Sequence, residues 1–341
     1  MALRNADSQP TPHRPARRDF LKNCVIGAAA LLGRQRGLGE GATPAPAPTR
    51  SKVVIGRDPM LRGSGSSLDS DRLLKLLDRA LASFYDCNSA AEAWKRVSRP
   101  GECVGLKVNC LAGRGASTTV KLVEAVTERL RQAGITDIVV WDRLNSDLES
   151  AGFRLNSKQP GVRYIGNDSA GYEDELFIHG SVGSLLSRTL TRTCDAVISM
   201  PVLKDHGIAG VTFALKNFFG AIHNPNKYHL TVGDPYVADV NMLPAVRQKV
   251  RLHICDATAV QYEGGPSYLP QWSWRFNGLL IGRDPVALDT VGWQVIEQKR
   301  AAEGMKSLQA LGRAPTYIAT AADADHRLGT NDPRQIERVE V

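Results

Sequence analysis

The sequence predicts an α/β fold with a mainly parallel, Rossmann-like sheet, flanked by helices and carrying long polar loops at the strand ends. Short apolar runs of strand length alternate with longer segments whose apolar residues recur every three or four positions. Two of these runs, 103–109 and 135–141, are joined by one helical segment, which favours parallel pairing. The hydrophobic share of 43% and the charged share of 23% are typical of a globular protein with a buried core.

In the first half of the chain, apolar periodicity and turn residues delimit four strands and two helices. The first helix places Leu73, Leu77 and Leu81 on one face, and Gly134 is the expected C-cap of the second. Residues 143–185 are richer in Gly, Asn and Asp and are predicted mainly as loops. The predicted strands are 53–57, 103–109, 135–141 and 162–165, and the predicted helices are 68–85 and 118–132.

The second half continues the alternation and ends on a strand. Asp284 and Pro285 open a helix as N-cap and first helical residue. Residues 223–238 and 257–277 are predicted as long loops. The predicted strands are 195–200, 250–255, 279–282 and 336–341, and the predicted helices are 185–192, 211–222 and 285–300. We expect one α/β domain over residues 51–341, after a signal and linker over residues 1–50.

The segment Arg17-Arg18-Asp19-Phe20-Leu21-Lys22 resembles the twin-arginine export motif. The apolar run that follows, 24–33, is too short for a membrane span of ~20 residues and suits a signal peptide. We therefore expect export to the periplasm in folded form, with the twin-arginine machinery as a partner and no transmembrane span beyond the signal. The alternative is a basic disordered tail. Cleavage stays open, because Pro48 follows the small-residue site Ala45-Pro46-Ala47.

The net charge of +8 does not indicate a nucleic-acid partner. Residues 1–50 contain eight basic and three acidic residues, so +5 of this charge lies in the N-terminal segment and +3 in the rest. Binding to nucleic acid needs a basic face on the folded domain, and stacking of bases needs aromatic residues, which make up 6% of the chain.

Five cysteines follow the predicted signal: Cys87, Cys103, Cys110, Cys194 and Cys255. They contain no C-x-x-C pair, so the spacings of iron–sulfur and zinc-ribbon sites are excluded. Most lie in or beside apolar runs and are expected to be buried. One disulfide is compatible with an oxidising compartment, and the pair stays open.

Polar residues gather where the predicted strands end, which is where open α/β sheets bind their ligands. These residues are Lys107 and Asn109, then Lys204, Asp205 and His206, then Asp256 with Glu263, and finally Arg283 with Asp284. A dense polar stretch, which includes Thr212, Lys216, Asn217, His223 and His229, lies between residues 212 and 239. We expect the functional site here.

Residues from about 100 to 300 resemble the family called domain of unknown function 362. The matching pieces are, in order, Gly105-Leu106-Lys107-Val108-Asn109, Lys204-Asp205-His206, Thr212-Phe213-Ala214-Leu215-Lys216-Asn217-Phe218-Phe219-Gly220, His229, Val237-Ala238-Asp239, Ile254-Cys255-Asp256, Gly264-Gly265-Pro266 and Asp284-Pro285-Val286-Ala287-Leu288-Asp289. The resemblance implies a fold and a site but no reaction. Many family members carry ferredoxin-like cysteine clusters, which this chain lacks, so no iron–sulfur cluster is implied.

Three sets of residues are candidates for the chemistry. The catalytic set is Lys107, Lys204, Lys216 and His206, since lysines can neutralise an anion or act as a desolvated amine. The ligand-binding set is Asn109, Asn217, Asp239, Asp284 and Asp289. The metal set is His206, His229, Asp256 and Glu263, whose imidazole and carboxylate groups suit a divalent transition metal.

Each set also has a structural alternative. Lys216 can be a surface lysine with a buried stem, and the histidines can be ordinary hydrogen-bonded loop residues. Asp284 can serve only as an N-cap, with Asp289 supporting the same helix.

Two functional hypotheses follow from these residues. The first is an exported enzyme that binds a small anionic ligand, with or without a divalent metal, and uses His206 or His229 as ligand or general base. The second is a non-catalytic exported binding protein, or a maturation factor for another exported enzyme, that uses the same lysines.

Overall fold

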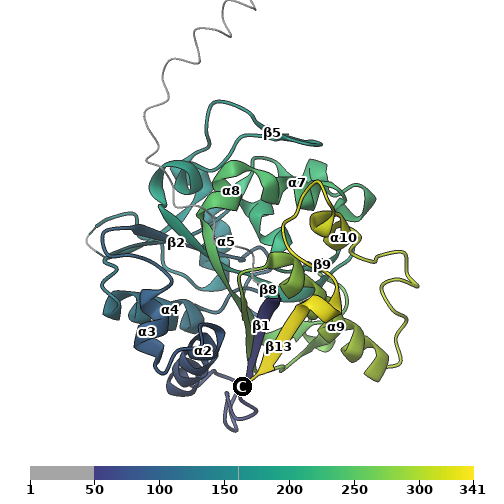
Figure 1. Cartoon of the computed structure of the whole chain (residues 1–341), viewed down its shortest axis with the longest axis horizontal. Coiled ribbons are helices and arrows are strands. Elements are labelled where there is room, and N and C mark those ends of the chain that lie inside the picture. Colours follow the sequence, from purple (N-terminus) through teal and green to yellow (C-terminus); the bar gives the residue numbers. More distant parts are fainter. Residues whose placement is uncertain (1–49, 160) are drawn as a thin grey trace, which may run out of the picture. The chain divides into compact units, whose positions relative to one another are not determined.

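A mixed sheet of mostly parallel strands forms the centre of the protein (Figure 1), as the sequence predicts. The computed structural model describes residues 50–159 and 161–341. The twin-arginine motif and the apolar run after it lie outside the described residues. Within the described residues, no helix is long and apolar enough to cross a membrane.

Eight strands form the main path of the sheet. In spatial order they are β13 (Ile336–Glu340), β1 (Ser51–Arg57), β12 (Gly278–Gly282), β10 (Val250–Gln261), β7 (Ala196–Met200), β2 (Cys103–Val108), β3 (Asp137–Asp142) and β4 (Val162–Gly166). Strands β10, β7, β2, β3 and β4 pair in parallel, and β12 is antiparallel to both of its neighbours. The predicted α/β class is confirmed.

The smaller strands attach at the edges of this path. The strands β8 (Val202–His206) and β11 (Ser273–Trp274) pair with β10, and β9 (Gly210–Thr212) pairs with β8. A separate hairpin contains β5 (Phe177–His179) and β6 (Val182–Ser184).

One face of the sheet is covered by α2 (Ser70–Phe84), α3 (Ala90–Lys95) and α4 (Val120–Gln132), which lie together in Figure 1. Asp69 is the N-cap of helix α2, and its side chain accepts a hydrogen bond from Arg72 N. Its residues Leu73, Leu77 and Leu81 are fully buried, as their helical spacing predicts. Helix α4 ends before Gly134, whose φ of +91° suits glycine.

The other face is covered by the 3-10 helix η3 (Leu215–Ala221) and by α7 (Tyr236–Met242), α9 (Pro285–Ala302) and α10 (Tyr317–Ala322). Asp284 is the N-cap of α9, as predicted, and accepts hydrogen bonds from Val286 N and Ala287 N. The remaining helices are α5 (Asn145–Ala151), α6 (Asn167–Ala170), α8 (Pro244–Lys249), η2 (Thr189–Thr193), η4 (Pro225–Tyr228), η5 (Thr231–Gly233), η6 (Pro270–Trp272) and η7 (Pro333–Gln335).

Several parts of the predicted secondary structure are wrong. Residues 143–185, predicted mainly as loops, also contain α5, α6, β5 and β6. In place of the helix predicted over 185–192, Leu186 and Ser187 form isolated β-bridges and η2 follows. The helix predicted over 211–222 is instead the end of β9 followed by η3, because a run of seven residues cannot separate a period of 3.0 from 3.6. Strand β8 was not predicted, since Lys204, Asp205 and His206 are residue types that strands rarely contain. The loops predicted at 223–238 and 257–277 contain the start of α7 and the end of β10.

The order of the strands places a crevice beside β2. The chain runs outward from β2 to β3 and β4, and then returns to pair β7 with the opposite side of β2. Connections that leave two neighbouring parallel strands in opposite directions open a crevice at their carboxyl ends. This reversal defines the position of the candidate site.

Candidate functional site

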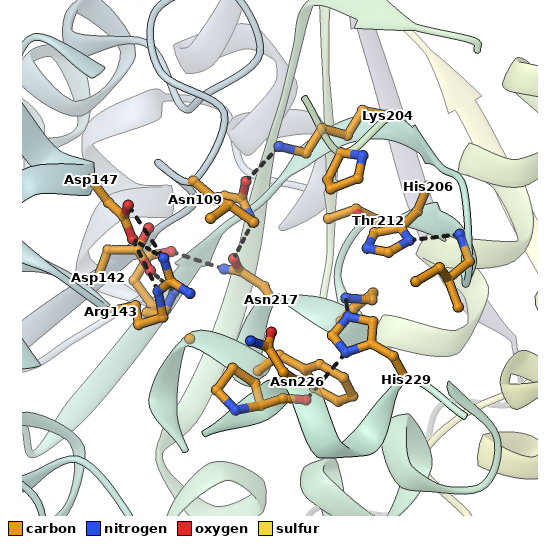
Figure 2. A pocket seen from close by; sticks show the side chains of 18 residues that line it. Asn109, Asp142, Arg143, Asp147, Lys204, His206, Thr212, Asn217, Asn226 and His229 are labelled. Carbon is orange, nitrogen blue, oxygen red and sulfur yellow. Dashed lines mark hydrogen bonds and ion pairs between the residues drawn. The ribbon is translucent and has the colours of Figure 1, made fainter. Parts of the chain in front are cut away.

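A pocket of about 340 Å³ opens at the carboxyl ends of β2 and β3, beside β8 (Figure 2). Its walls come from segments that are distant in the sequence. The polar residues that line it are Lys107, Asn109, Asp142, Arg143, Asp147, Lys204, His206, Thr212, Lys216, Asn217, Asn226 and His229. The apolar part of the wall includes Leu111, Ile208, Phe219 and Pro225.

Two ion pairs occupy the side of the pocket nearest β3. The Lys107 Nζ lies 2.7 Å from Asp142 Oδ1, and both side chains are almost fully buried. The second carboxylate oxygen of Asp142 accepts the Cys110 backbone N–H at 2.6 Å. Beside this pair, Arg143 lies 3.1 Å from Asp147. Burial raises the pKa of Asp147, and Arg143 partly offsets that rise. Each cation on this side therefore has its own carboxylate.

Lys204 reaches the pocket because successive side chains of the strand β8 point to opposite sides of it. Lys204 and His206 line the pocket, whereas Asp205 between them forms an ion pair with Arg313 on the other side. The Lys204 Nζ donates to Asn109 Oδ1 at 3.0 Å and to Ala116 O at 2.9 Å. Burial lowers the pKa of Lys204 to about 8.

Lys216 reaches the pocket because η3 has three residues per turn, which aligns positions three apart. Leu215 and Phe218 are fully buried in the core, whereas Lys216 and Phe219 line the pocket. The Lys216 Nζ lies 4.5 Å from the centre of the Phe219 ring. Burial, followed by the nearby Lys204 charge, lowers the pKa of Lys216 to about 7.

The hydrogen bonds of the two pocket histidines define their tautomers. His206 Nδ1 lies 3.2 Å and 3.1 Å from the backbone N–H groups of Ile208 and Ala209, so it accepts and the ring proton is on Nε2. His229 Nδ1 lies 3.2 Å from the Pro225 carbonyl oxygen, which can only accept, so this nitrogen carries the proton. The Lys216 Nζ lies 2.9 Å from His229 Nε2, which therefore accepts from the amine.

Both rings are neutral at physiological pH. Burial lowers the pKa of His206 to about 2 and that of His229 to about 4, and the charge of Lys216 adds to both effects. The two rings stack with their centres 5.3 Å apart. His206 therefore presents a neutral Nε2–H donor, and His229 holds the amine of Lys216.

Two asparagines cross the centre of the pocket, and Figure 2 shows Asn109 between Asn217 and Lys204. Asn217 Nδ2 donates to Lys107 O and to Ser199 Oγ, both at 3.0 Å. Asn217 Oδ1 accepts from Asn109 Nδ2 at 3.5 Å, and Asn109 Oδ1 accepts from Lys204. This chain of hydrogen bonds sets the positions of both amide groups.

Buried residues behind the pocket hold η3 in place. Asp289 Oδ1 accepts from Ala214 N at 2.7 Å and from Leu215 N at 3.3 Å. Burial raises the pKa of Asp289 well above its usual range. A β-carbon on Gly220 would lie 2.7 Å from both Lys107 Nζ and Asp142 Oδ1, so only glycine allows this close approach.

The structure brings some of the predicted site residues together and separates others. The residues that line the pocket are Lys107, Asn109, Lys204, His206, Lys216, Asn217 and His229. Of the predicted ligand-binding residues, Asp239 accepts from Ser181 N and His326 Nε2, Asp284 caps α9, and Asp289 caps η3. These three aspartates support the fold and do not line this pocket.

The four predicted metal ligands do not converge. Asp256 accepts from Thr119 N and Thr258 N, and Glu263 pairs with Arg300 and Arg313. Ligation by His206 Nε2 would require its proton to move to Nδ1, against two backbone N–H groups. Among the described residues, no group of three or more His, Cys, Asp and Glu side chains is arranged to hold a metal ion.

Several pocket residues were not singled out in the sequence. Arg143 and Asp147 fall in a segment predicted as loop, and Asn226 falls in another. The Asp142-Arg143 pair directly after the strand predicted over 135–141 is the signal that could have identified both, because this strand ends beside residues 107–109.

The cysteines do not contribute to the polar face of the pocket. All five within the described residues are free thiols, and all except Cys87 are buried, as expected. Burial raises the pKa of the Cys110 and Cys255 thiols well above the usual range, so these thiols are inert.

Residues 104–294, more than half of the chain, match the family described as domain of unknown function (DUF362). The chain belongs to this family, as its motifs indicated. Comparison with curated proteins gives no match.

Two solved structures are similar at low identity. One is the crystal structure of a Thermotoga maritima protein, with a TM-score of 0.39, 9% identity, and coverage of 64% of this chain and 56% of that one. The other is the lactate racemase apoprotein from Thermoanaerobacterium thermosaccharolyticum, with a TM-score of 0.37, 11% identity, and coverage of 60% and 52%. The matched region thus spans about half the length of each.

Proposed function

We propose that the protein is an enzyme whose substrate is a small anion bound in the pocket at the carboxyl ends of β2 and β3. The observation that carries this proposal is the pair of buried lysines, Lys204 and Lys216. Among the described residues, neither forms an ion pair with a carboxylate, although their side chains are only 1% and 7% exposed. Buried charges without partners are costly, and a bound anion would offset the cost of both.

The other polar groups of the pocket fit the same ligand. His206 offers an Nε2–H donor, and the Thr212 hydroxyl is buried without a hydrogen-bond partner in the described part of the chain. The carboxylates of the pocket, Asp142 and Asp147, are each paired with a cation and leave Lys204 and Lys216 free. A volume of about 340 Å³ suits a small molecule.

The state of Lys216 favours an enzyme over a passive binding protein. A catalytic group works best when its pKa is close to the working pH, and burial brings the pKa of Lys216 to about 7. A binding protein would need only a lysine that stays charged at the working pH. Lys216 can therefore take part in the reaction as well as in binding.

Calorimetric titration with inorganic phosphate, acetate and pyruvate tests the proposal. We expect Lys204→Met and Lys216→Met each to weaken binding by about tenfold to a hundredfold, because each removes a charged hydrogen bond of about 1.5–3 kcal/mol. The matched control is Lys227→Met, since Lys227 is an exposed lysine outside the pocket. Equal affinities for the wild type and both pocket variants would refute the proposal.

We further propose that the chain is exported to the periplasm through the twin-arginine pathway. The support is the motif Arg17-Arg18-Asp19-Phe20-Leu21-Lys22 directly before an apolar run. A fusion of residues 1–52 to a folded reporter tests this proposal. The reporter should be exported, and the change of Arg17 and Arg18 to Lys should abolish export. Equal export of both fusions would refute it.

A further inference from the structure

The amine of Lys216 differs from every other amine of the pocket in the partners it has. Its Nζ lies 2.9 Å from His229 Nε2 and above the Phe219 ring, and in the described residues it has no carboxylate partner. Lys107 is equally buried but lies 2.7 Å from Asp142. Lys204 donates to two oxygen acceptors, Asn109 Oδ1 and Ala116 O. Lys216 has only the His229 nitrogen as an acceptor in the described residues, and burial and the nearby Lys204 charge favour its uncharged form.

The hydrogen bond to His229 also orients this amine. Because His229 Nδ1–H donates to the Pro225 carbonyl oxygen, Nε2 can only accept, and it takes one N–H of Lys216. The lone pair of the uncharged amine therefore points away from His229. Lys204 keeps its positive charge to higher pH, with a pKa of about 8 against about 7 for Lys216. Between about pH 7 and pH 8, one pocket thus contains a nucleophilic amine and a cation.

We infer that Lys216 Nζ forms an imine with a carbonyl group of the bound anion, which makes short 2-oxo acids the substrate class. This inference rests on the proposed function. The Lys216 nitrogen attacks the carbonyl carbon and forms a C–N bond, which gives a carbinolamine. The C–O bond then breaks, and the oxygen leaves as water with the two hydrogens that the amine loses. No oxidant, reductant or metal is needed for this step.

The hydrogen-bond donors of the pocket favour a carbonyl compound that also carries a carboxylate. Lys204 and the Thr212 hydroxyl, neighbours across the β8–β9 pairing, can bind a carboxylate. His206 Nε2–H can donate to the carbonyl oxygen and stabilise the negative charge that develops there. In a 2-oxo acid the carboxylate is bonded directly to the carbonyl carbon. One small pocket can therefore place the carboxylate at Lys204 and the carbonyl carbon at the Lys216 amine.

Reductive trapping tests the inference. The full chain is incubated with pyruvate and sodium cyanoborohydride, digested, and mapped by mass spectrometry. We expect one reduced adduct per chain, on Lys216, and at least tenfold slower labelling by acetone, which lacks the carboxylate. Propionate, which lacks the carbonyl, should compete with pyruvate. Labelling should rise between pH 6 and pH 8 as the amine loses its proton.

Variants make the result specific. Lys216→Arg keeps a positive charge and should abolish the adduct, whereas Lys227→Met should not change it. If Lys216→Arg does not fold, competition by propionate in the native chain provides the same test. Pyruvate binding that depends on Lys204 without an adduct on Lys216 would overturn the inference and leave the proposed function intact. Absence of binding by pyruvate, acetate and phosphate alike would overturn both.

Discussion

Both sides of the pocket contain buried cationic side chains, but these cations are paired with carboxylates on one side and are not on the other. Near β3, Lys107 pairs with Asp142 and Arg143 pairs with Asp147. On the side formed by β8 and η3, the cations are hydrogen-bonded, within residues 50–159 and 161–341, only to neutral groups: an amide and a carbonyl for Lys204, and an imidazole for Lys216.

This difference distinguishes the charged residues that support the fold from those that can bind a ligand. A buried ion pair satisfies its own charges, and its removal damages the fold. A buried lysine that is hydrogen-bonded to neutral groups has no counter-charge until an anionic ligand binds. Without that ligand, its burial lowers the stability of the fold. The exposed fraction alone does not distinguish Lys107 from Lys204 and Lys216, since all three side chains are buried.

The largest effect is expected on the paired side. Asp142→Asn leaves the Lys107 ammonium buried without a counter-charge, so we expect the free energy of unfolding to fall by about 3–5 kcal/mol. Urea unfolding followed by circular dichroism measures this loss. A loss below about 1 kcal/mol would mean that the two sides of the pocket do not differ as described.

The next effect is the pH dependence of anion binding on the unpaired side. Lys216 and Lys204 have pKa values of about 7 and about 8 in the free protein. A bound anion favours their charged forms, so affinity should be highest below pH 7. Above pH 8, affinity should fall by about tenfold per pH unit for each proton taken up on binding. Calorimetry with sulfate between pH 6 and pH 9 checks this, and a flat profile would argue against both lysines.

A smaller effect of opposite sign is expected for Lys216→Met. Removal of an unpaired buried amine should raise the stability of the ligand-free protein by about 1–2 kcal/mol at pH 7, while anion binding is weakened. The pKa of Lys216 is lowered from 10.5 to about 7 by folding, so the unfolded chain binds more protons between these values. Wild-type stability therefore rises with pH over this range, and the advantage of the variant shrinks. Thermal unfolding at pH 7 and pH 10 measures both, and destabilisation at pH 7 would assign Lys216 a structural role.

The smallest effect on binding is expected for Asp284→Ala. Asp284 caps α9 and accepts from Ser51 and Thr330, outside the pocket. Stability should fall by about 1 kcal/mol through loss of the cap, with no change in anion affinity. A weaker affinity by calorimetry would return Asp284 to the ligand-binding set.

The sequence was sufficient to predict the class of fold and the edge of the sheet where the pocket lies. Strand ends follow from apolar runs, and parallel strands bring their carboxyl ends to one edge, so Lys107, Asn109 and Lys204 could be expected near each other. The position of Lys216 in an apolar segment also indicated that its charge had a specific role.

The partners of each side chain could not be predicted from the sequence. Asp284 and Asp289 are identical residue types in one helix, yet the first caps that helix and the second caps η3 from a distant part of the chain. The metal set failed for the same reason, since Glu263 is neutralised by Arg300 and Arg313, which are 37 and 50 residues away. Long-range pairing of this kind depends on the folded chain and leaves no local pattern.

The 3-10 turn of η3 has a consequence for how this part of the chain can change in evolution. With three residues per turn, an inserted residue rotates every later side chain by about a third of a turn. The apolar row of Leu215, Phe218 and Ala221 would then move toward the pocket, and Asn217 would move to a core position. Substitutions in this segment can have graded effects, whereas a one-residue insertion or deletion removes the pocket altogether. Homologous chains that keep the function are expected to keep the length of this segment even where its residues differ.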